Sequence, residues 1–252
     1  MRIAALYDIH GNLPALDAVL AEVAREGVDR VVVGGDVLPG PMARECLRRL
    51  ESLDVPTEFL RGNGDRETLD ESPDRPSRVP VSARVQLRWC RSQLDDAQAA
   101  AVAAWPPHVR LDVPDLGAVL FCHATPRNDE EVVTQLIPEE LLLAIYDGAG
   151  DVVVCGHTHI RYDRMIGRTR VVNAGSVGMP FERPGAYWIL IDGGIEFRRT
   201  SYDLEAAAEA VRRTSFPDAA QFASVYILQP PDMLQMFTTY GLDALKAAGH
   251  GA

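Results

Sequence analysis

The sequence has few cysteines, and none of them are paired along the chain. Its 252 residues include four cysteines, and no two of these stand in a Cys-x-x-Cys motif. Cys122 and Cys155 each end a run of apolar residues, a setting that suits a reduced, buried thiol. We therefore expect no disulfide framework, as is typical of a cytoplasmic protein.

Long apolar runs are missing as well. No stretch approaches the roughly 20 apolar residues that a membrane-spanning helix needs. The first residues also lack the apolar core of a signal peptide. Both absences predict a cytoplasmic protein with no membrane partner.

Positive charge is scarce. The chain carries 25 Lys and Arg residues against 36 Asp and Glu residues, a formal net charge of −11, and it has no basic run. Duplex nucleic acid requires a basic face, so neither duplex binding nor a nuclease is favoured. A small phosphorylated substrate stays compatible with this charge, because bound metal cations reverse its sign locally.

The length and ordinary globular composition predict one domain over residues 1–252. Its core, about residues 1–200, carries the motifs described below. A helical tail is expected over about residues 203–252, with Asp203 as its N-cap. Aromatic and methionine side chains of the tail are candidates for packing back on the core or for contacting a second copy in a homodimer. These are Phe222, Tyr226, Met233, Met236, Phe237 and Tyr240.

Strands and helices alternate in the first part of the chain. Apolar or β-branched runs at residues 2–6, 31–33 and 57–60 predict strands. Helical spacing of apolar residues predicts helices at 13–26 and about 41–53. This alternation is typical of a mainly parallel sheet.

The later part of the chain predicts a different pattern. Residues 66–80 are charged and rich in proline, which indicates a surface loop, and residues 81–104 predict one helix. Another helix is expected around 138–146. Hairpins at 162–173 and 186–200 indicate antiparallel strands, and we expect them to form a second sheet packed on the first.

Residues that can bind a metal follow the first predicted strand. Asp8 and His10 stand two positions apart, and extended backbone would point both side chains the same way. Open α/β sheets bind ligands at this edge, and mixed oxygen and nitrogen donors suit a transition metal. Taken alone, the pair also fits an aspartate that caps a helix beside an unrelated histidine. Asn12 is a suitable N-cap for the helix that follows.

The same kind of residue recurs at other strand ends, and four of the six histidines lie there. Asp36 follows Asp8 by 28 residues and Asn63 follows Asp36 by 27, about one strand–helix unit each. Seven such groups suffice for two metal ions when one carboxylate bridges them. They are Asp8, His10, Asp36, Asn63, His123, His157 and His159.

The order D-x-H, G-D, G-N-x-D, H and G-H-x-H over residues 8–159 resembles the calcineurin-like metallophosphoesterase superfamily. It is most similar to the small bacterial and archaeal phosphodiesterase-like members, which also share a turn like that at residues 173–178. The resemblance covers about residues 1–200. It implies an α/β fold, a four-layer α/β/β/α sandwich of two mixed β-sheets.

The resemblance also implies the cofactors and their ligands. One metal ion would be held by Asp8, His10, Asp36 and His159, and the other by Asp36, Asn63, His123 and His157. Asp36 would then bridge the two ions, and Asp36, Asn63 and His123 would be catalytic. The expected cofactors are two divalent transition-metal ions, manganese first, with iron, nickel or zinc as alternatives.

The activity implied is hydrolysis of phosphodiester or activated phosphoester bonds by a metal-bridging hydroxide. Gly64 stands where many members have a histidine that protonates the leaving group, which disfavours unactivated alkyl phosphomonoesters. One alternative is a phosphomonoesterase or nucleotide phosphatase. Another, of a different class, is a non-catalytic scaffold with the same fold. The expected partner is a small phosphorylated substrate, such as a nucleotide or phosphodiester.

Other polar residues flank the motifs. Asp65 and backbone carbonyls are candidates for orienting the ligand imidazoles. Four arginines are candidates for binding phosphate, with a solvated surface role as the alternative. They are Arg61, Arg66, Arg127 and Arg161.

Overall fold

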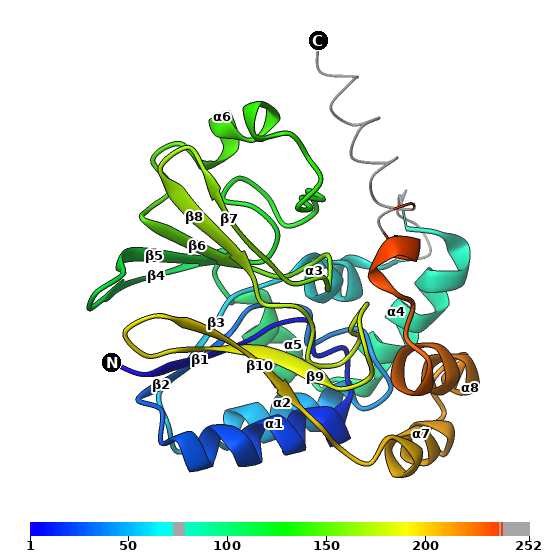
Figure 1. Cartoon of the computed structure of the whole chain (residues 1–252). Coiled ribbons are helices and arrows are strands. Elements are labelled where there is room, and N and C mark those ends of the chain that lie inside the picture. Colours follow the sequence, from blue (N-terminus) through cyan, green and yellow to red (C-terminus); the bar gives the residue numbers. More distant parts are fainter. Residues whose placement is uncertain (73–78, 237, 239–252) are drawn as a thin grey trace.

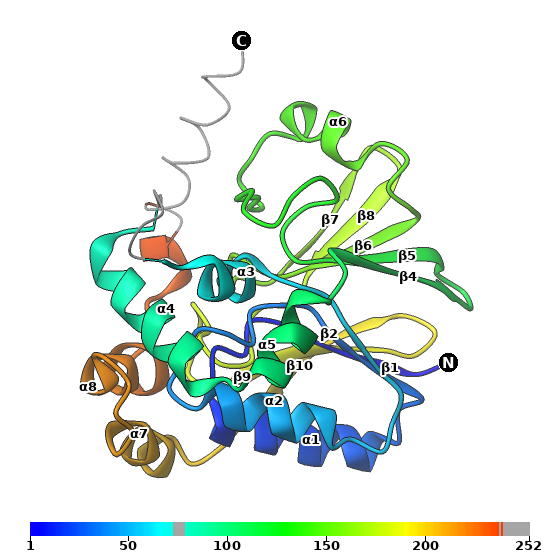
Figure 2. The same ribbon diagram turned by 180° about the vertical axis from the view of Figure 1, so that it is seen from behind.

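Two five-stranded β-sheets lie face to face in the computed structural model (Figures 1 and 2), which describes residues 1–72, 79–236 and 238. The first sheet contains, in spatial order, β10 (Ile195–Thr200), β9 (Ala186–Ile191), β1 (Ile3–Leu6), β2 (Arg30–Val33) and β3 (Thr57–Phe59). The second contains β4 (His108–Val113), β5 (Gly117–Cys122), β6 (Val152–Cys155), β8 (Thr169–Asn173) and β7 (Tyr162–Ile166). Both sheets mix parallel and antiparallel pairs, which confirms the expected architecture.

In the first sheet, β1, β2 and β3 pair in parallel, as predicted. Helices α1 (Leu13–Glu26) and α2 (Ala43–Glu51) make the two crossovers. Asn12 caps α1 by accepting a hydrogen bond from the backbone N–H of Ala15 at 3.3 Å.

The final hairpin corrects the expectation for the second sheet. Strands β9 and β10 join the first sheet, where β9 pairs antiparallel with β1, Ile191 opposite Ile3. All six residues of β9 are buried, so this strand needs cover on both of its faces. A place beside β1, between the outer helices and the second sheet, provides that cover.

Strand β1 separates two parts of the core. Ala4 and Leu6 pack among apolar residues of α1 and α2, while Ala5 and Tyr7 pack between the sheets, near Phe121. Burial on both faces explains the unbroken apolar run of this strand.

The outer face of the second sheet is covered more thinly. The predicted helix at 138–146 is a 3₁₀ turn, η1 (Glu139–Leu141), followed by the single turn α6 (Leu143–Tyr146). Leu142 and Tyr146 pack on the sheet beside Val153. With α1 and α2 on the opposite side, helices flank both sheets (Figure 1).

Two predictions are wrong for the part of the chain that runs from β3 to β4. The predicted loop at 66–80 is in part a helix, α3 (Asn63–Asp70), and residues 73–78 lie outside the described residues. The predicted helix at 81–104 is two helices, α4 (Val81–Gln93) and α5 (Asp96–Ala103). The break comes at Asp95, whose side chain accepts from the backbone N–H of Gln98 at 2.8 Å and caps α5.

The C-terminal segment packs back on α4. It contains α7 (Leu204–Arg212), capped by Asp203 as predicted, then α8 (Ala219–Phe222) and a π-helix, η2 (Ala223–Leu228). Their apolar side chains form a cluster with Cys90 of α4. Phe237, Tyr240 and the rest of 239–252 lie outside the described residues.

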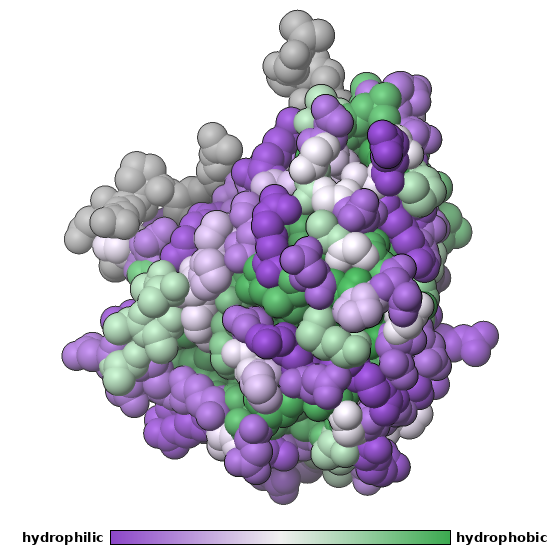
Figure 3. Space-filling model, turned by 90° about the vertical axis from the view of Figure 1, so that its left-hand side faces the viewer, coloured by the Kyte–Doolittle hydropathy of each residue, from purple (hydrophilic) through white to green (hydrophobic). Residues whose placement is uncertain are grey.

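All four cysteines are free and buried, in agreement with the sequence. Within the described residues, no helix has the length and apolar character needed to cross a membrane. Figure 3 shows one face of the molecule, where hydrophilic residues predominate and hydrophobic ones lie in the recesses between them.

Candidate metal centre

The candidate ligands follow the carboxyl ends of β1, β2, β3, β5 and β6, so both sheets contribute to one site. Their backbone is not extended, as the sequence reasoning assumed. Asp8, His10, Asp36, His157 and His159 all have φ between 45° and 66°, a left-handed conformation that non-glycine residues rarely adopt. Such strain persists only where surrounding contacts impose it, and it is concentrated at functional sites.

Backbone hydrogen bonds hold the two strained loops together. The N–H of Asp8 donates to the carbonyl of Gly35 at 3.1 Å, and the N–H of His10 donates to that of Asp36 at 2.9 Å. The side chains therefore converge because two turns are joined, and not because residues two apart share a strand face.

Two overlapping clusters of potential ligands result. Asp8 lies with His10 and His159 in one, and with Asp36 and His123 in the other. The Oδ1 atom of Asp8 lies 3.3 Å from Nε2 of His159 and 3.9 Å from Nε2 of His123. The Oδ2 atom of Asp36 lies 3.6 Å from Nε2 of His10 and 3.5 Å from Nε2 of His123. Asp36 thus lies between the two groups of imidazoles.

Backbone carbonyls fix the orientation of three imidazoles. The Nδ1 atom of His10 bonds the carbonyl of Pro39 at 3.2 Å, and that of His159 bonds the carbonyl of Met179 at 2.6 Å. His123 does the same with the carbonyl of Gly34 at 2.9 Å. A proton on each Nδ1 leaves the Nε2 lone pairs directed into the site, as in metal-binding histidines.

This arrangement fits a cation. The Oδ1 atom of Asp8 is buried and has no hydrogen-bond partner among the described residues. The Nε2 atoms of His10 and His159 lie 3.2 Å apart, so two lone pairs face each other. A buried carboxylate oxygen without a partner is costly, and a positive ion among these atoms removes the cost.

The pKa shifts of the site also indicate that it attracts a cation. Burial alone would lower the pKa of His123, but the Asp36 carboxylate raises it to about 10. Burial raises the pKa of Asp36 and the imidazoles of His123 and His10 outweigh it, so the carboxyl pKa falls below its usual range. Burial raises the pKa of the Asp8 carboxyl as well, and the imidazoles of His159 and His123 outweigh it. Both carboxylates are therefore ionised and attract positive charge, which a proton on His123 or a bound cation can supply.

The other two predicted ligands lie beside His123. The Oδ1 atom of Asn63 is 3.1 Å from Nε2 of His123. The ring of His157 is 5.2 Å from that of His123, but its Nε2 atom faces the carbonyl of Glu130 at 3.1 Å. His157 therefore borders the site without belonging to either cluster, and its role as a ligand stays a prediction.

The Asp65 carboxylate binds backbone N–H groups and does not orient the ligand imidazoles, which corrects the role expected for it from the sequence. Its buried carboxylate accepts hydrogen bonds from the N–H groups of Asp36 at 2.8 Å, Leu38 at 2.9 Å and Gly62 at 3.0 Å. Burial, followed by the charge of Asp36, raises its pKa to about 7. Asp65 thus ties the loop after β2 to the start of α3.

The turn at residues 173–178 has a structural role that sequence spacing did not reveal. The hydroxyl of Ser176 donates to the carbonyl of Asp8 at 2.7 Å and accepts from the N–H of Met179 at 2.7 Å. The N–H of Gly178 also donates to the Asp8 carbonyl, at 3.0 Å. One small-residue turn therefore holds both the Asp8 loop and the carbonyl that orients His159.

Three of the four candidate arginines are engaged in ion pairs. Arg66 pairs with Asp129 and Glu130, Arg127 with Glu131, and Arg161 with Glu182. Arg61 donates to the carbonyl of Ala103 and forms no ion pair within the described residues. It lines a cavity of about 300 Å³ that reaches His123.

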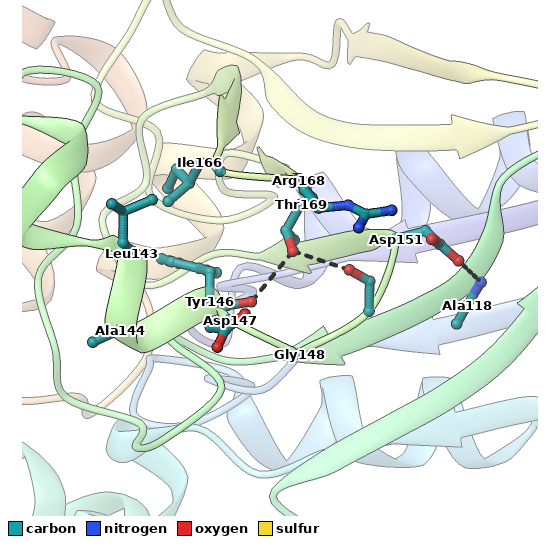
Figure 4. A pocket seen from close by; sticks show the side chains of 12 residues that line it. Ala118, Leu143, Ala144, Tyr146, Asp147, Gly148, Asp151, Ile166, Arg168 and Thr169 are labelled. Carbon is teal, nitrogen blue, oxygen red and sulfur yellow. Dashed lines mark hydrogen bonds between the residues drawn. The ribbon is translucent and has the colours of Figure 1, made fainter.

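A larger cavity, of about 740 Å³, lies away from these histidines, beside α6 (Figure 4). Two of its polar side chains are hydrogen-bonded. The Thr169 hydroxyl lies 3.2 Å from the carbonyl of Tyr146 and 3.0 Å from that of Gly150, and Asp151 accepts from the N–H of Ala118 at 2.8 Å. No candidate metal-binding cluster of the described residues lies there.

A sandwich of two mixed sheets with clustered aspartates and histidines at its strand ends is the arrangement expected of a metal-dependent phosphoester hydrolase. The chain belongs to the calcineurin-like phosphoesterase superfamily, whose domain model matches residues 1–192. Membership implies hydrolysis of phosphoesters with divalent metal ions, and the clusters described above are the candidate ligands.

Similar proteins share the fold over nearly the whole chain. A hypothetical protein from Pyrococcus horikoshii has a TM-score of 0.76 at 18% identity, over 91% of this chain and 99% of that one. A metallophosphoesterase from Sphaerobacter thermophilus has a TM-score of 0.69 at 22% identity, over 90% and 99%. An uncharacterized protein from Methanocaldococcus jannaschii is 24% identical over 237 residues, 86% of this chain and 94% of its own length.

Gly64 has a steric reason to lack a side chain. A Cβ atom at this position would lie 2.6 Å from the carbonyl oxygen of Leu38. We expect Gly64→Ala to lower the stability by about 1–3 kcal/mol through this clash. Gly194→Ala is the control, because nothing lies within 4 Å of its Cβ position. Thermal unfolding of both variants tests this, and equal melting temperatures would contradict the steric account.

Asp65→Asn should destabilise the protein more than an ordinary cap substitution. The amide nitrogen would face a backbone N–H in place of one carboxylate oxygen, leaving buried donors unpaired at a cost of about 1–3 kcal/mol. Asp203→Asn is the matched control, because Asp203 caps α7 with one hydrogen bond and Asn caps equally well. Denaturant unfolding measures both. If the two variants lose the same stability, Asp65 does not act as a tie.

Proposed function

We propose that this protein is a dinuclear metal-dependent phosphodiesterase that acts on small substrates. One ion would be held by Asp8, His10, Asp36 and His159, and the other by Asp36, Asn63, His123 and His157. The observation that carries the proposal is the pair of clusters around Asp8, whose buried Oδ1 atom lacks a hydrogen-bond partner within the described residues. Asp36 belongs to one cluster and lies 3.6 Å from His10 of the other, which is why we assign the bridge to Asp36.

The metal ions would supply a water of lowered pKa as nucleophile and neutralise charge on the phosphoryl group. Every other contribution comes from the chain. Asp36, between His10 and His123, is placed to bridge the two sites. The carbonyls of Gly34 and Pro39 keep the Nε2 lone pairs of His123 and His10 directed inward.

Arg61 is the candidate for substrate phosphate. It lines the cavity beside His123 and has no acidic partner within the described residues, so its guanidinium can donate to phosphate oxygens. Arg66 and Arg127 line the same cavity but are neutralised by acidic neighbours. This cavity therefore favours the phosphate end of a substrate.

The preference for diesters follows from position 64. Hydrolysis breaks the bond between phosphorus and the leaving oxygen, and that oxygen must then take a proton. The Leu38 carbonyl occupies the space where a side chain of residue 64 would begin, so no histidine can donate the proton there. Activated leaving groups, such as the aryl groups of aryl phosphodiesters, suit such a site better than unactivated alkyl phosphomonoesters.

A non-catalytic scaffold is the less favoured reading. Burying two carboxylates among imidazoles costs stability unless a cation compensates, and five strained residues add to that cost. A scaffold would gain nothing from this loss of stability. Location in the cytoplasm stays a prediction from the free cysteines.

Asp36→Asn removes the charge between His10 and His123. We expect loss of bound metal and a fall in diester hydrolysis of more than about 100-fold, because a bridging ligand serves both ions. Asp163→Asn is the control, since Asp163 pairs with Arg170 on the sheet surface, away from the candidate ligands. Elemental analysis gives the metal content. Full metal content together with full activity in Asp36→Asn would disprove the bridging assignment.

Substrate choice and metal dependence separate the candidate functions. With Mn²⁺ or Ni²⁺ we expect faster hydrolysis of bis-p-nitrophenyl phosphate than of p-nitrophenyl phosphate. A chelator should abolish activity and lower the melting temperature, because metal binds the folded state. A faster monoester reaction would indicate a phosphomonoesterase. Hydrolysis of neither substrate with any metal would indicate a scaffold.

A further inference from the structure

A second cavity reaches the metal centre at His10, and Arg61 does not line it. It has a volume of about 310 Å³ and lies between α4, α8 and η2. His10, Pro39 and Met179 form its inner end. Pro39 and Met179 are also the residues whose carbonyls orient His10 and His159. A ligand in this cavity, named here the aromatic cavity, is therefore adjacent to the His10 cluster.

Aromatic rings form one wall of the aromatic cavity. The ring of Phe222 packs edge-on against that of Phe216, with centroids 5.9 Å apart, and against that of Tyr226, with centroids 5.3 Å apart. Phe216 and Phe222 are almost completely buried, so the wall is rigid. Tyr226 is partly exposed, and a ring of this kind can stack with the flat face of any nucleobase.

Polar groups without partners line the rest. The carboxamides of Gln86 and Gln221 and the carboxylate of Asp218 form no hydrogen bond or ion pair within the described residues. Gln86 comes from α4, and the other two come from the start of α8 and the residue before it. Each carboxamide offers both a donor and an acceptor, whereas the carboxylate only accepts.

The outer wall does not belong to the part of the chain that defines the family. The family model matches residues 1–192, while the aromatic wall, Asp218 and Gln221 lie between residues 216 and 226. Figures 1 and 2 show this C-terminal segment beside α4 on one flank of the molecule. The aromatic wall of the cavity thus lies outside the part of the chain that the family model matches.

We propose that the aromatic cavity binds the nucleoside part of the phosphodiester substrate, with a base that carries an amino group. This inference rests on the proposed function, since the metal centre then acts on the phosphate attached to that nucleoside. Adenine, cytosine and guanine each carry an amino group, and the Asp218 carboxylate can accept a hydrogen bond from it. Uracil presents carbonyl oxygens there, and a carboxylate repels them.

A cationic head group fits the same cavity less well. An aromatic wall with a carboxylate attracts a quaternary ammonium group. Such a group has nothing to offer the two carboxamides, which would stay unpaired when a bound ligand displaced their water. The directional groups of Gln86 and Gln221 favour a base edge.

Equilibrium binding to the manganese-loaded protein tests the inference without hydrolysis. We expect adenosine 5′-monophosphate and cytidine 5′-monophosphate to bind at least about tenfold tighter than ribose 5-phosphate, and at least about fivefold tighter than uridine 5′-monophosphate. Phosphocholine should bind no tighter than ribose 5-phosphate. Titration calorimetry measures all five ligands.

Substitutions locate the binding. Gln86→Ala and Gln221→Ala should each reduce the preference for adenosine 5′-monophosphate over ribose 5-phosphate to below about threefold, because the base edge loses its partner. Gln93→Ala is the matched control. Gln93 is also half-buried on α4 but does not line the aromatic cavity, so the preference should stay. Melting temperatures confirm that all three variants are folded.

Each failure has its own meaning. Equal binding of adenosine 5′-monophosphate and ribose 5-phosphate by a protein that hydrolyses bis-p-nitrophenyl phosphate would overturn the inference and leave the proposed function standing. Tighter binding of phosphocholine would assign the cavity to a cationic group and overturn it as well. Base-selective binding by a protein that hydrolyses neither nitrophenyl ester would uphold the cavity assignment and refute the proposed function.

Discussion

The negative charge buried at Asp8 and Asp36 is the constraint on which the rest of the structure depends. Two ionised carboxylates lie among imidazoles at the meeting point of two sheets, and one oxygen of Asp8 has no partner within the described residues. Chains bury such charge only where it is compensated. The left-handed backbone at five of these positions, the tie through Asp65 and the Ser176 turn all serve to keep these groups together.

The sandwich provides the rigidity for this arrangement. Asp8 and Asp36 follow strands of the first sheet, whereas His123, His157 and His159 follow strands of the second. Side chains such as Tyr7 pack between the sheets and fix their relative position, so the two halves of the site meet in one geometry. The orienting carbonyls extend this rigidity to the ring nitrogens.

The two cavities beside the centre differ in character. The one at His123 contains Arg61 and other arginines, and suits phosphate. The aromatic cavity at His10 combines rings with amide and carboxylate groups that have no partner among the residues the structure describes. A substrate that spans both would place its phosphorus at the metal centre, its nucleoside towards α4 and α8, and its remaining phosphate oxygens towards Arg61. The acidic surface of the protein does not prevent such binding. Salt screens the long-range repulsion of the substrate, whereas the contacts within both cavities are short.

Much of the fold and of the site could be predicted from the sequence, because both depend on local patterns. Apolar runs and helical spacing define β1, α1 and β2, and ligand-type residues at strand ends with regular spacing indicate where chemistry occurs. The sequence did not reveal that β9 lies beside β1, that Asp95 divides one helix into two, or that Asp65 bonds backbone instead of imidazole. The order of strands in a sheet, the point at which a helix is divided by a capping residue, and the partners of a buried carboxylate all depend on contacts between residues far apart in the chain. The left-handed turns at Asp8 and His10 and the aromatic cavity also arise only when distant segments pack together, because tertiary contacts impose the strain and close the walls.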